Sequence, residues 1–332
     1  MATLLWSADN VVCISDSSFI AVNTRHCDIP AFREKRSKPG SAALATAEES
    51  KPAAEETKGT NEPAKDQSGA ESDPTHLPSG RILSACFSPN GRFFALCDDF
   101  KTLSLYDTNG WHKLSTRVTP KRCIALAFNH AEDTLYAADK FGDVYQFSVS
   151  EPSSEGQLIL GHLSMLLDVA VSPDDKYILT ADRDEKVRIS HLPNAYNIHA
   201  YCLGHQEFVS RIAVVPGFDN LVITGGGDST LRVWDYRLGR QLCSQPLCPP
   251  RDRDGEEEKE MDVEEEEKGE QEVGEESGGT QRQIVSGISC CQRHGLVAVT
   301  ILGSQHVLLY RVISTESDGV NVSALLPLDV GA

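Results

Sequence analysis

The sequence predicts an all-β fold, a propeller of four-stranded blades, and three observations predict it. A segment of about 43 residues recurs along the chain. Apolar residues occupy the same place in four successive copies, at spacings of 41, 43 and 43 residues, namely Phe87, Phe128, Val171 and Val214. No stretch of comparable length has the periodicity of a helix. Each copy therefore corresponds to one blade whose strands are joined by turns.

Each copy contains further strand-length runs that are rich in β-branched and aromatic residues and separated by Asp, Gly, Pro or Asn. The second and third runs of the four copies are residues 93–96 and 103–106, 135–138 and 144–147, 177–180 and 187–189, and 221–224 and 231–234. Residues 4–22 and 284–312 supply strands of two more blades. We therefore expect N-terminal propeller strands in 1–32, blades in 81–248 and, in 282–332, the last visible blade with a C-terminal tail.

One copy carries polar residues typical of a WD repeat, in which hydrogen bonds tie the loop before a blade to its strands. These residues are Gly204, His205, Thr224, Asp228 and Trp234. The preceding copy repeats the set as His162, Thr180 and Asp184, with Ser190 in place of the tryptophan. A histidine with an aspartate is also typical of a catalytic base or a metal site. Because the repeat period explains both histidines and no third ligand or nucleophile recurs at a fixed offset, we interpret the set as structural.

The number of blades leaves the closure of the ring open. Six blades are visible, whereas seven is the usual number in WD propellers, and closure removes exposed sheet edges. The first blade also looks incomplete and should need a closing strand from the other terminus. We therefore expect seven blades and a missing C-terminal part, with a six-bladed ring as the alternative.

Two segments interrupt the repeat pattern, and both are expected to be disordered insertions. Residues 33–80 are rich in Ala, Glu, Lys, Ser, Pro and Gly and contain few large apolar residues. Their first six residues include four basic ones, a pattern that nuclear import signals share with ordinary disordered chains. Residues 249–281 contain fifteen acidic and four basic residues between positions 251 and 276, a net charge of −11 out of −18 for the chain. Such a run is typical of a spacer, and the alternative is a mimic that competes with nucleic acid for basic surfaces.

Composition favours a protein of the cytosol or nucleus. The N-terminal residues lack the basic start and apolar stretch of an export signal, and no run approaches the length that spans a membrane. Ten cysteines are scattered, mostly within apolar strands, and none forms a C-x-x-C pair. Buried free thiols are the expected state. If the adjacent Cys290 and Cys291 lie in a strand, at most one of them is exposed.

Signs of an independent enzyme are missing from the sequence. The glycine cluster Gly225-Gly226-Gly227 joins two expected strands, which predicts a hairpin turn and not a phosphate-binding loop. No G-x-S-x-G, H-E-x-x-H or Walker sequence occurs. No cofactor or metal site is therefore expected in this chain, although propellers can carry catalysis at the central channel.

Charges recur in the loop between the second and third strands of each blade, which lies on one rim of a propeller. This loop reads Asp98-Asp99, Asp139-Lys140, Asp182-Arg183 and Gly226-Gly227 in successive blades. In the following strand Val187 and Ile189 should face inward and Arg188 outward. Lys121 and Arg122 precede the strand of the blade that contains Lys140. Each charge alone is typical of a solvated surface, but together they favour a salt-bridged partner interface.

The same segments carry a family resemblance. Residues 138–140, 142–145, 161–175, 178–186 and 203–211 resemble the WD-repeat non-catalytic subunit of the eukaryotic tRNA (guanine-N7) methyltransferase. The stretches Leu-Ser-Met-Leu-Leu-Asp-Val and Ala-Asp-Arg-Asp-Glu-Lys are specific to this subfamily and are not general WD features. The resemblance is strong over about residues 79–241, weak at both ends and absent from the two insertions.

The resemblance implies a heterodimer with a separate Rossmann-type subunit that holds S-adenosylmethionine and methylates a variable-loop guanine of tRNA. This chain would keep the enzyme in its active shape and help to seat the tRNA, in the nucleus and also in the cytoplasm. The implied contacts with the enzyme are Lys140, Asp182, Arg183, Lys186 and Arg188, together with Lys121 and Glu185. Because the chain is acidic, most contacts with RNA phosphates are expected from the partner.

An alternative function comes from a short motif. Residues 233–237, Val-Trp-Asp-Tyr-Arg, fit the W-D-x-R box that resembles substrate receptors of cullin-type ubiquitin ligases, where the arginine meets the ligase adaptor. The motif overlaps the ordinary ending of a blade. A scaffold for other partners is a third interpretation.

Overall fold

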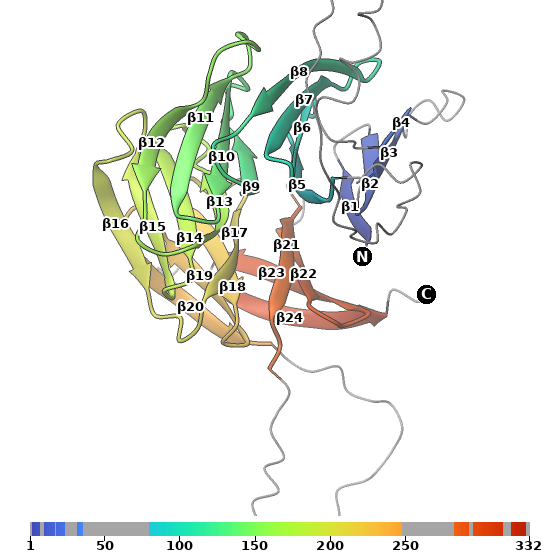
Figure 1. Cartoon of the computed structure of the whole chain (residues 1–332). Helices are drawn as coiled ribbons and strands as arrows, with labels where there is room; N and C mark the ends of the chain where they lie inside the picture. Colours follow the sequence, from blue (N-terminus) through green and yellow to red (C-terminus); the bar gives the residue numbers. More distant parts are fainter. Residues whose placement is uncertain are drawn as a thin grey trace, which may run out of the picture. The chain divides into compact units, whose positions relative to one another are not determined.

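Strands form all of the regular structure in the described part of the chain. The computed structural model describes residues 2–6, 10–16, 18–23, 32–35, 80–247, 282–291, 295–314 and 320–329. Within these ranges lie twenty-four strands and no helix, and hence no helix that could cross a membrane. The strands form six four-stranded sheets, each made of four strands consecutive in the sequence (Figure 1). Their pairing is antiparallel, as short turns between neighbouring strands require.

The contacts within the chain divide it into two compact units, and the first comprises residues 1–123 and 151–155. Its sheets are β1 (Ala2–Trp6), β2 (Asn10–Ser15), β3 (Ser18–Asn23) and β4 (Phe32–Lys35), and β5 (Ile82–Phe87), β6 (Phe93–Asp98), β7 (Thr102–Asp107) and β8 (His112–Val118). Aromatic rings fill the core between them: the centroid of the Phe19 ring lies 5.4 Å from that of Phe94 and 5.5 Å from that of Tyr106. All three side chains are fully buried.

The first sheet is complete within residues 2–35. Strand β4 pairs with β3, with Ile20 opposite Arg33 and Ser18 opposite Lys35. The expectation that this blade needs a closing strand from the other terminus is therefore wrong, and the boundary expected at residue 33 falls inside a strand. The sequence pattern missed β4 because an outermost strand can be rich in charged residues. The remainder of the expected insertion, residues 36–79, lies outside the described residues.

The second unit contains the remaining four sheets. Their strands are β9 (Cys123–Phe128), β10 (Thr134–Asp139), β11 (Asp143–Ser148) and β12 (Gln157–Gly161); β13 (Leu166–Val171), β14 (Tyr177–Asp182), β15 (Lys186–His191) and β16 (Ile198–Leu203); β17 (Val209–Val214), β18 (Leu221–Gly226), β19 (Thr230–Asp235) and β20 (Arg240–Pro246); and β21 (Val285–Cys290), β22 (Leu296–Ile301), β23 (His306–Ser314) and β24 (Val320–Asp329). The first strands β13, β17 and β21 of successive sheets contact one another. The expected acidic insertion, residues 249–281, lies wholly outside the described residues.

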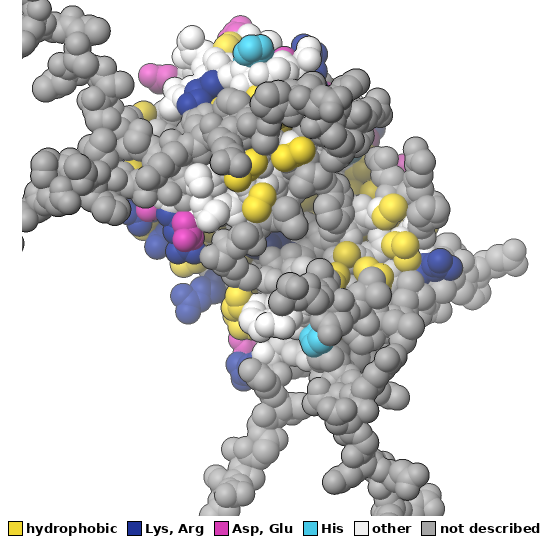
Figure 2. All heavy atoms as spheres, turned by 90° about the vertical axis from the view of Figure 1, so that its right-hand side faces the viewer, with side chains coloured by type: hydrophobic (Ala, Val, Ile, Leu, Met, Phe, Trp, Pro, Cys, Tyr) yellow, Lys and Arg dark blue, Asp and Glu magenta, His cyan; other side chains and the backbone are white. Residues whose placement is uncertain are grey.

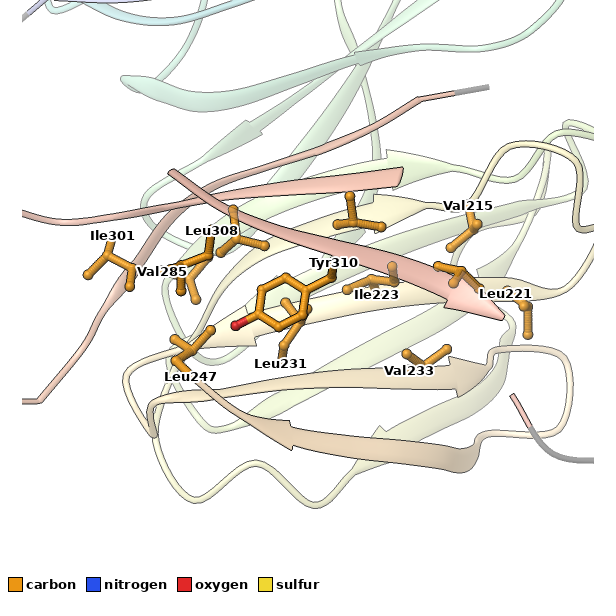
Figure 3. Close-up of a cluster of buried hydrophobic side chains, with 13 residues drawn as sticks. Val215, Leu221, Ile223, Leu231, Val233, Leu247, Val285, Ile301, Leu308 and Tyr310 are labelled. Carbon is orange, nitrogen blue, oxygen red and sulfur yellow. The ribbon is translucent and has the colours of Figure 1, made fainter. Parts of the chain in front are cut away.

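Packing between neighbouring sheets buries both faces of their middle strands. Figure 3 shows one such cluster, in which Ile223, Leu231 and Val233 of one sheet pack with Leu308 and Tyr310 of the next. Every residue of β18 is buried. Burying an apolar side chain of this size contributes about 1.5–3 kcal/mol, so these clusters supply the main stabilisation of the unit. The fourth strand of a sheet is more exposed, as in β16.

Six sheets agree with the six blades counted in the sequence, and the seventh expected blade stays a prediction. The expected C-terminal tail includes strand β24, which pairs with β23 along its length. The eight cysteines in the described ranges are free thiols, and three of them, Cys97, Cys123 and Cys202, are buried. Of the adjacent pair, Cys290 ends strand β21 and is half-buried, whereas Cys291 follows the strand and is exposed.

Candidate functional site

The residues of the WD set in the β17–β20 sheet form one hydrogen-bonded chain. Trp234 Nε1 donates to Thr224 Oγ1 at 2.7 Å, and His205 Nε2 lies 2.7 Å from the same hydroxyl. His205 Nδ1 lies 2.9 Å from Asp228 Oδ2. The distances are satisfied when Thr224 donates to Nε2 and His205 donates from Nδ1 to the carboxylate. Both ring nitrogens are then used inside the fold, which supports a structural role.

The β13–β16 sheet repeats this chain with a different aspartate. His162 Nε2 lies 2.8 Å from Thr180 Oγ1, and Nδ1 lies 3.2 Å from Asp182 Oδ2. Asp184, the expected partner, is exposed and accepts a hydrogen bond from Ser164 Oγ at 2.8 Å. The prediction for Asp184 is therefore wrong. Asp182 was expected to contact a partner, but its side chain is fully buried and serves the internal network.

A glycine explains the shift of the aspartate between the two sheets. Asp98, Asp139 and Asp182 end the second strand of three sheets, and in each case one carboxylate oxygen accepts the backbone N–H groups of the following turn. Gly226 occupies this position in the fourth sheet. A Cβ atom there would lie 1.9 Å from the carbonyl oxygen of Phe208, so no side chain fits. Asp228, two residues later, supplies the carboxylate instead.

The two sheets also differ at an arginine in equivalent register. Arg232 lies opposite Thr224, and its guanidinium reaches Thr230, Gln241 and Asp228 at 3.1, 2.7 and 3.4 Å. Arg188 lies opposite Thr180, donates to the carbonyl of Gly161 at 2.9 Å and has no hydrogen-bond partner at Nε.

Arg188 does not face outward as the alternation of the strand predicts. Its residue is 8% exposed, and its neighbours Val187 and Ile189 are fully buried. The prediction for Arg188 is wrong because a middle strand between two packed sheets has no solvent face. Burial also lowers the pKa of the Arg188 guanidinium. A buried cation with one carbonyl acceptor is incompletely compensated.

A hollow of about 260 Å³ opens beside Arg188. Its lining comes from the link after β12, the turn after β14, strand β15 and strand β16, and consists of Gly161, His162, Leu163, Ser164, Asp182, Asp184, Lys186, Arg188 and Tyr201. Lys186 Nζ lies 3.0 Å from Asp182 and 3.5 Å from Asp184, so this lysine is shared between two carboxylates. Among the described residues Arg188 forms no ion pair within 4 Å, although the charge of Asp182 acts to raise its pKa.

Opposing effects set the ionisation of Asp182. Burial of its carboxyl acts to raise the pKa, but hydrogen bonds from His162 and Lys186 outweigh it and hold the pKa below the ordinary value. Asp228 follows the same rule, since burial is outweighed by hydrogen bonds from His205 and Thr230, and its pKa is lowered. Both carboxylates stay charged at neutral pH.

Exposed residues surround the hollow and form, with it, what we call the docking rim: Lys140, Phe141, Leu163, Arg183 and Glu185. Leu163 is fully exposed and Phe141 is 61% exposed. The turn that carries Lys140 and Phe141 is tied to the hollow by a hydrogen bond from the amide of His162 to the carbonyl of Gly142 at 2.8 Å. Arg183 is tied in by its own amide, which donates to the carbonyl of Met165 at 2.9 Å. Figure 2 shows a different face, the right-hand side of Figure 1, where basic and acidic side chains also lie next to each other.

Backbone strain marks one residue of the docking rim. The third-strand turns of four sheets each hold a residue with positive φ at the equivalent place, namely Lys101, Gly142, Glu185 and Ser229. A non-glycine residue in this conformation costs about 1 kcal/mol or more, and because Lys101 and Ser229 share it, the conformation belongs to the repeat as well as to the docking rim. Glu185, with φ of 67°, is therefore held in a fixed and unfavourable backbone conformation while its side chain is exposed.

Two predicted residues are not among those that form the docking rim. Lys121 is exposed and belongs to the first unit, on the link after β8. Arg237 of the W-D-x-R box lies at the turn after β19, and its guanidinium pairs with Asp174 at 3.1 Å. The adaptor contact of Arg237 stays a prediction.

Sequence reasoning missed the hollow and the apolar part of the docking rim. A signal was present, because Leu163 follows Gly161-His162 where the next repeat has Gln206 after Gly204-His205. An apolar residue at a polar repeat position is typical of a binding surface.

Comparison with known proteins shows the family to which the chain belongs. The family described as the tRNA methyltransferase TRM82 WD40 domain matches residues 30–154 and 146–329. The chain belongs to this family. Its fold is accordingly a β-propeller, which confirms the predicted fold class. A chain in the crystal structure of the mitotic checkpoint complex has a similar fold, with a TM-score of 0.66 and 15% sequence identity over 99% of this chain and 80% of that chain.

Similar curated proteins are named tRNA (guanine-N(7)-)-methyltransferase non-catalytic subunit WDR4. Those of Mus musculus and Homo sapiens are 58% identical over 148 residues, which is 45% of this chain and 36% of theirs. That of Xenopus laevis is 42% identical over 220 residues, or 66% of this chain and 50% of its own. The chain thus matches between about a third and a half of the length of these family members.

Proposed function

We propose that this chain is the non-catalytic subunit of a tRNA (guanine-N7) methyltransferase and binds the catalytic subunit at the docking rim. The names of the similar family members support this role. The single observation that carries the location is the contrast between Arg232, each of whose guanidinium nitrogens has a hydrogen-bond partner within the fold, and Arg188, which lines a hollow and donates to one backbone carbonyl.

The chemistry of the docking rim specifies what the catalytic subunit should present. A carboxylate that enters the hollow can accept hydrogen bonds from Arg188, because guanidinium groups bind carboxylates in a bidentate manner. Basic side chains can pair with Glu185 and Asp184, and acidic ones with Lys140 and Arg183. Leu163 supplies exposed apolar surface that a partner can bury favourably.

The division of labour follows from what each subunit contributes. The catalytic subunit would hold S-adenosylmethionine and carry out methyl transfer to a variable-loop guanine of tRNA. This chain would bind that subunit in its active shape and help to seat the tRNA. A rigid sheet scaffold suits this task, since catalytic groups must be positioned within fractions of an ångström.

The test is a double charge reversal on the docking rim, Lys140→Glu with Arg183→Glu. Reversal creates like-charge contacts with the partner, so we expect affinity for the catalytic subunit to fall on the order of tenfold or more at physiological salt. Methylation of tRNA by the catalytic subunit should then no longer be stimulated. The matched control is Lys176→Glu with Arg240→Glu, which changes the same charge at exposed positions of the same unit.

Melting curves separate binding from folding in this test. Both double variants should melt close to the parent protein, because all four side chains are exposed and surface ion pairs contribute about 1 kcal/mol or less. If the docking-rim variant still co-purifies with the catalytic subunit like the control does, the proposed location is wrong. If the parent chain fails to stimulate methylation, the proposed function is wrong.

A further inference from the structure

The second sheet of the first unit differs in charge from the rest of the chain. Residues 80–123 contain seven basic and three acidic residues, a net charge of +4 in a chain of −18. Residues 124–247 contain nine basic and sixteen acidic residues, a net charge of −7. Since charges are screened beyond about 8–10 Å at physiological salt, a ligand at the surface of this sheet experiences mainly the local positive charge.

Four of the basic residues gather at the turn between β6 and β7 and form what we call the basic rim: Arg81, Lys101, Lys121 and Arg122. All four are exposed. The amide of Arg81 donates to Asp99 Oδ1 at 2.9 Å, and Nε of Arg122 donates to the carbonyl of Asp99 at 3.0 Å. Thr119 links the other two, because its hydroxyl donates to the carbonyl of Lys101 or of Lys121, at 3.1 and 2.7 Å.

The backbone of the basic rim is therefore fixed before any ligand binds. Lys101 occupies the left-handed position of its turn with φ of 63°, at the place where glycine stands in the β10–β11 turn. Asp98 holds this turn, since its Oδ1 accepts the amides of Phe100 and Thr102 at 3.1 and 2.9 Å. A rigid array of cations loses little conformational entropy in the backbone when it binds a polyanion.

We infer that the basic rim contacts the phosphate backbone of RNA. Phosphate contacts need exposed cations in a fixed array and no pocket, because they position a nucleic acid without reading its bases. A duplex presents a negative charge about every 1.7 Å, a density that a protein surface does not match. This inference rests on the proposed function for the identity of the RNA as tRNA, and it revises the expectation that the partner supplies most phosphate contacts.

The experiment measures binding of a fluorescent tRNA transcript between 50 and 300 mM salt, by the whole chain alone and in complex with the catalytic subunit. The variant is Lys101→Glu with Lys121→Glu. The matched control is Arg92→Glu with Lys113→Glu, on the same sheet, where Arg92 and Lys113 lie over the rings of Phe93 and Tyr106. Thermal melting of all three proteins checks that the sheet is intact.

The basic-rim variant should bind tRNA on the order of tenfold more weakly than the parent, and its log Kd should depend less on log salt by about 1.4–1.8, as loss of two phosphate contacts predicts. The control should keep the parent's salt dependence. Equal losses in both variants, or no loss in either, would overturn the inference. Tighter binding of a polyglutamate peptide than of tRNA would also overturn it, because the surface would then serve an acidic protein.

Measurements on the chain alone and on its complex with the catalytic subunit keep this inference separate from the proposed function. An intact complex with unchanged salt dependence in the basic-rim variant contradicts phosphate binding and leaves docking of the catalytic subunit in place. If the chain does not bind the catalytic subunit at all, the measurement on the chain alone still reports on the basic rim.

Discussion

The β13–β16 and β17–β20 sheets contain the same hydrogen-bonded chain of His, Thr and Asp. We call the network closed in the second sheet, where a tryptophan also donates to the threonine, and open in the first, which has a serine in place of the tryptophan. Trp234 completes the closed network, whereas Ser190 occupies the equivalent register in the open one and its hydroxyl has no hydrogen-bond partner. Each guanidinium nitrogen of Arg232 has a hydrogen-bond partner, whereas Arg188 donates to one carbonyl and its Nε has none. The two repeats can therefore be compared with each other. The unpaired Nε of Arg188 and Oγ of Ser190 are buried, so a partner can reach only the part of the Arg188 guanidinium that lines the hollow.

The largest effect is expected from removing the closing tryptophan. Trp234→Ala deletes a fully buried side chain and the donor to Thr224, so we expect a loss of about 3–5 kcal/mol in the free energy of unfolding. Ser190→Ala in the open sheet should cost less than about 1 kcal/mol because its hydroxyl has no partner to lose. Urea denaturation of both variants measures the difference. Similar losses would contradict the distinction between a closed and an open network.

Substitution of the two histidines should also destabilise the closed network more than the open one. His205→Ala removes hydrogen bonds of 2.9 Å to Asp228 and 2.7 Å to Thr224 and should cost about 2–3 kcal/mol, although Arg232 and Trp234 still contact these two residues. His162→Ala should cost about 1–2 kcal/mol, since its hydrogen bond to Asp182 is longer, at 3.2 Å. The same denaturation experiment applies, and a larger loss for His162→Ala would reverse the comparison.

A smaller effect is expected on the pH dependence of the free energy of unfolding. In both networks the folded carboxyl has a lowered pKa, so its contribution to stability is present above the unfolded pKa of about 4 and is lost as the pH falls through the folded value. Asp182→Asn and Asp228→Asn should therefore each flatten the acid limb of stability by up to about 1.4 kcal/mol per pH unit. Asp184→Asn is the matched control, because this carboxyl is 60% exposed. An acid limb that neither buried variant changes would contradict the assignment.

The strands and the repeated hydrogen-bonded residues were predictable from sequence because the patterns that indicate them are local. Apolar runs, turn residues and the 43-residue period identified the strands and brought His205, Thr224, Asp228 and Trp234 together. The partner of His162, Asp182 and not Asp184, was not predictable from the repeat with His205, because that repeat uses Asp228 where Gly226 approaches the carbonyl oxygen of Phe208 too closely for a side chain. Local patterns contain no information about such approaches.

Burial of charged residues was missed for a related reason. Alternation along β15 placed Arg188 on the outside, but packing of sheets on both faces of the strand leaves no outside. The charge of the chain was misleading in another way. Its net charge of −18 obscured the net charge of +4 of residues 80–123. Net charge describes solubility and average attraction, while binding depends on charge within a Debye length.

The smallest effect on stability, and the sharpest test of the comparison, comes from exchanging the two arginines for methionine. Arg188→Met removes a buried cation that has one carbonyl acceptor, so the protein should melt at the same temperature or slightly higher. Its affinity for the catalytic subunit should nevertheless fall, because the hollow loses the donor for a carboxylate. Arg232→Met should do the reverse, since Asp228 and Gln241 lose a partner while the docking rim is untouched. Thermal melting and titration with the catalytic subunit separate the two variants, and equal behaviour in both measurements would mean that Arg188 is only a structural residue.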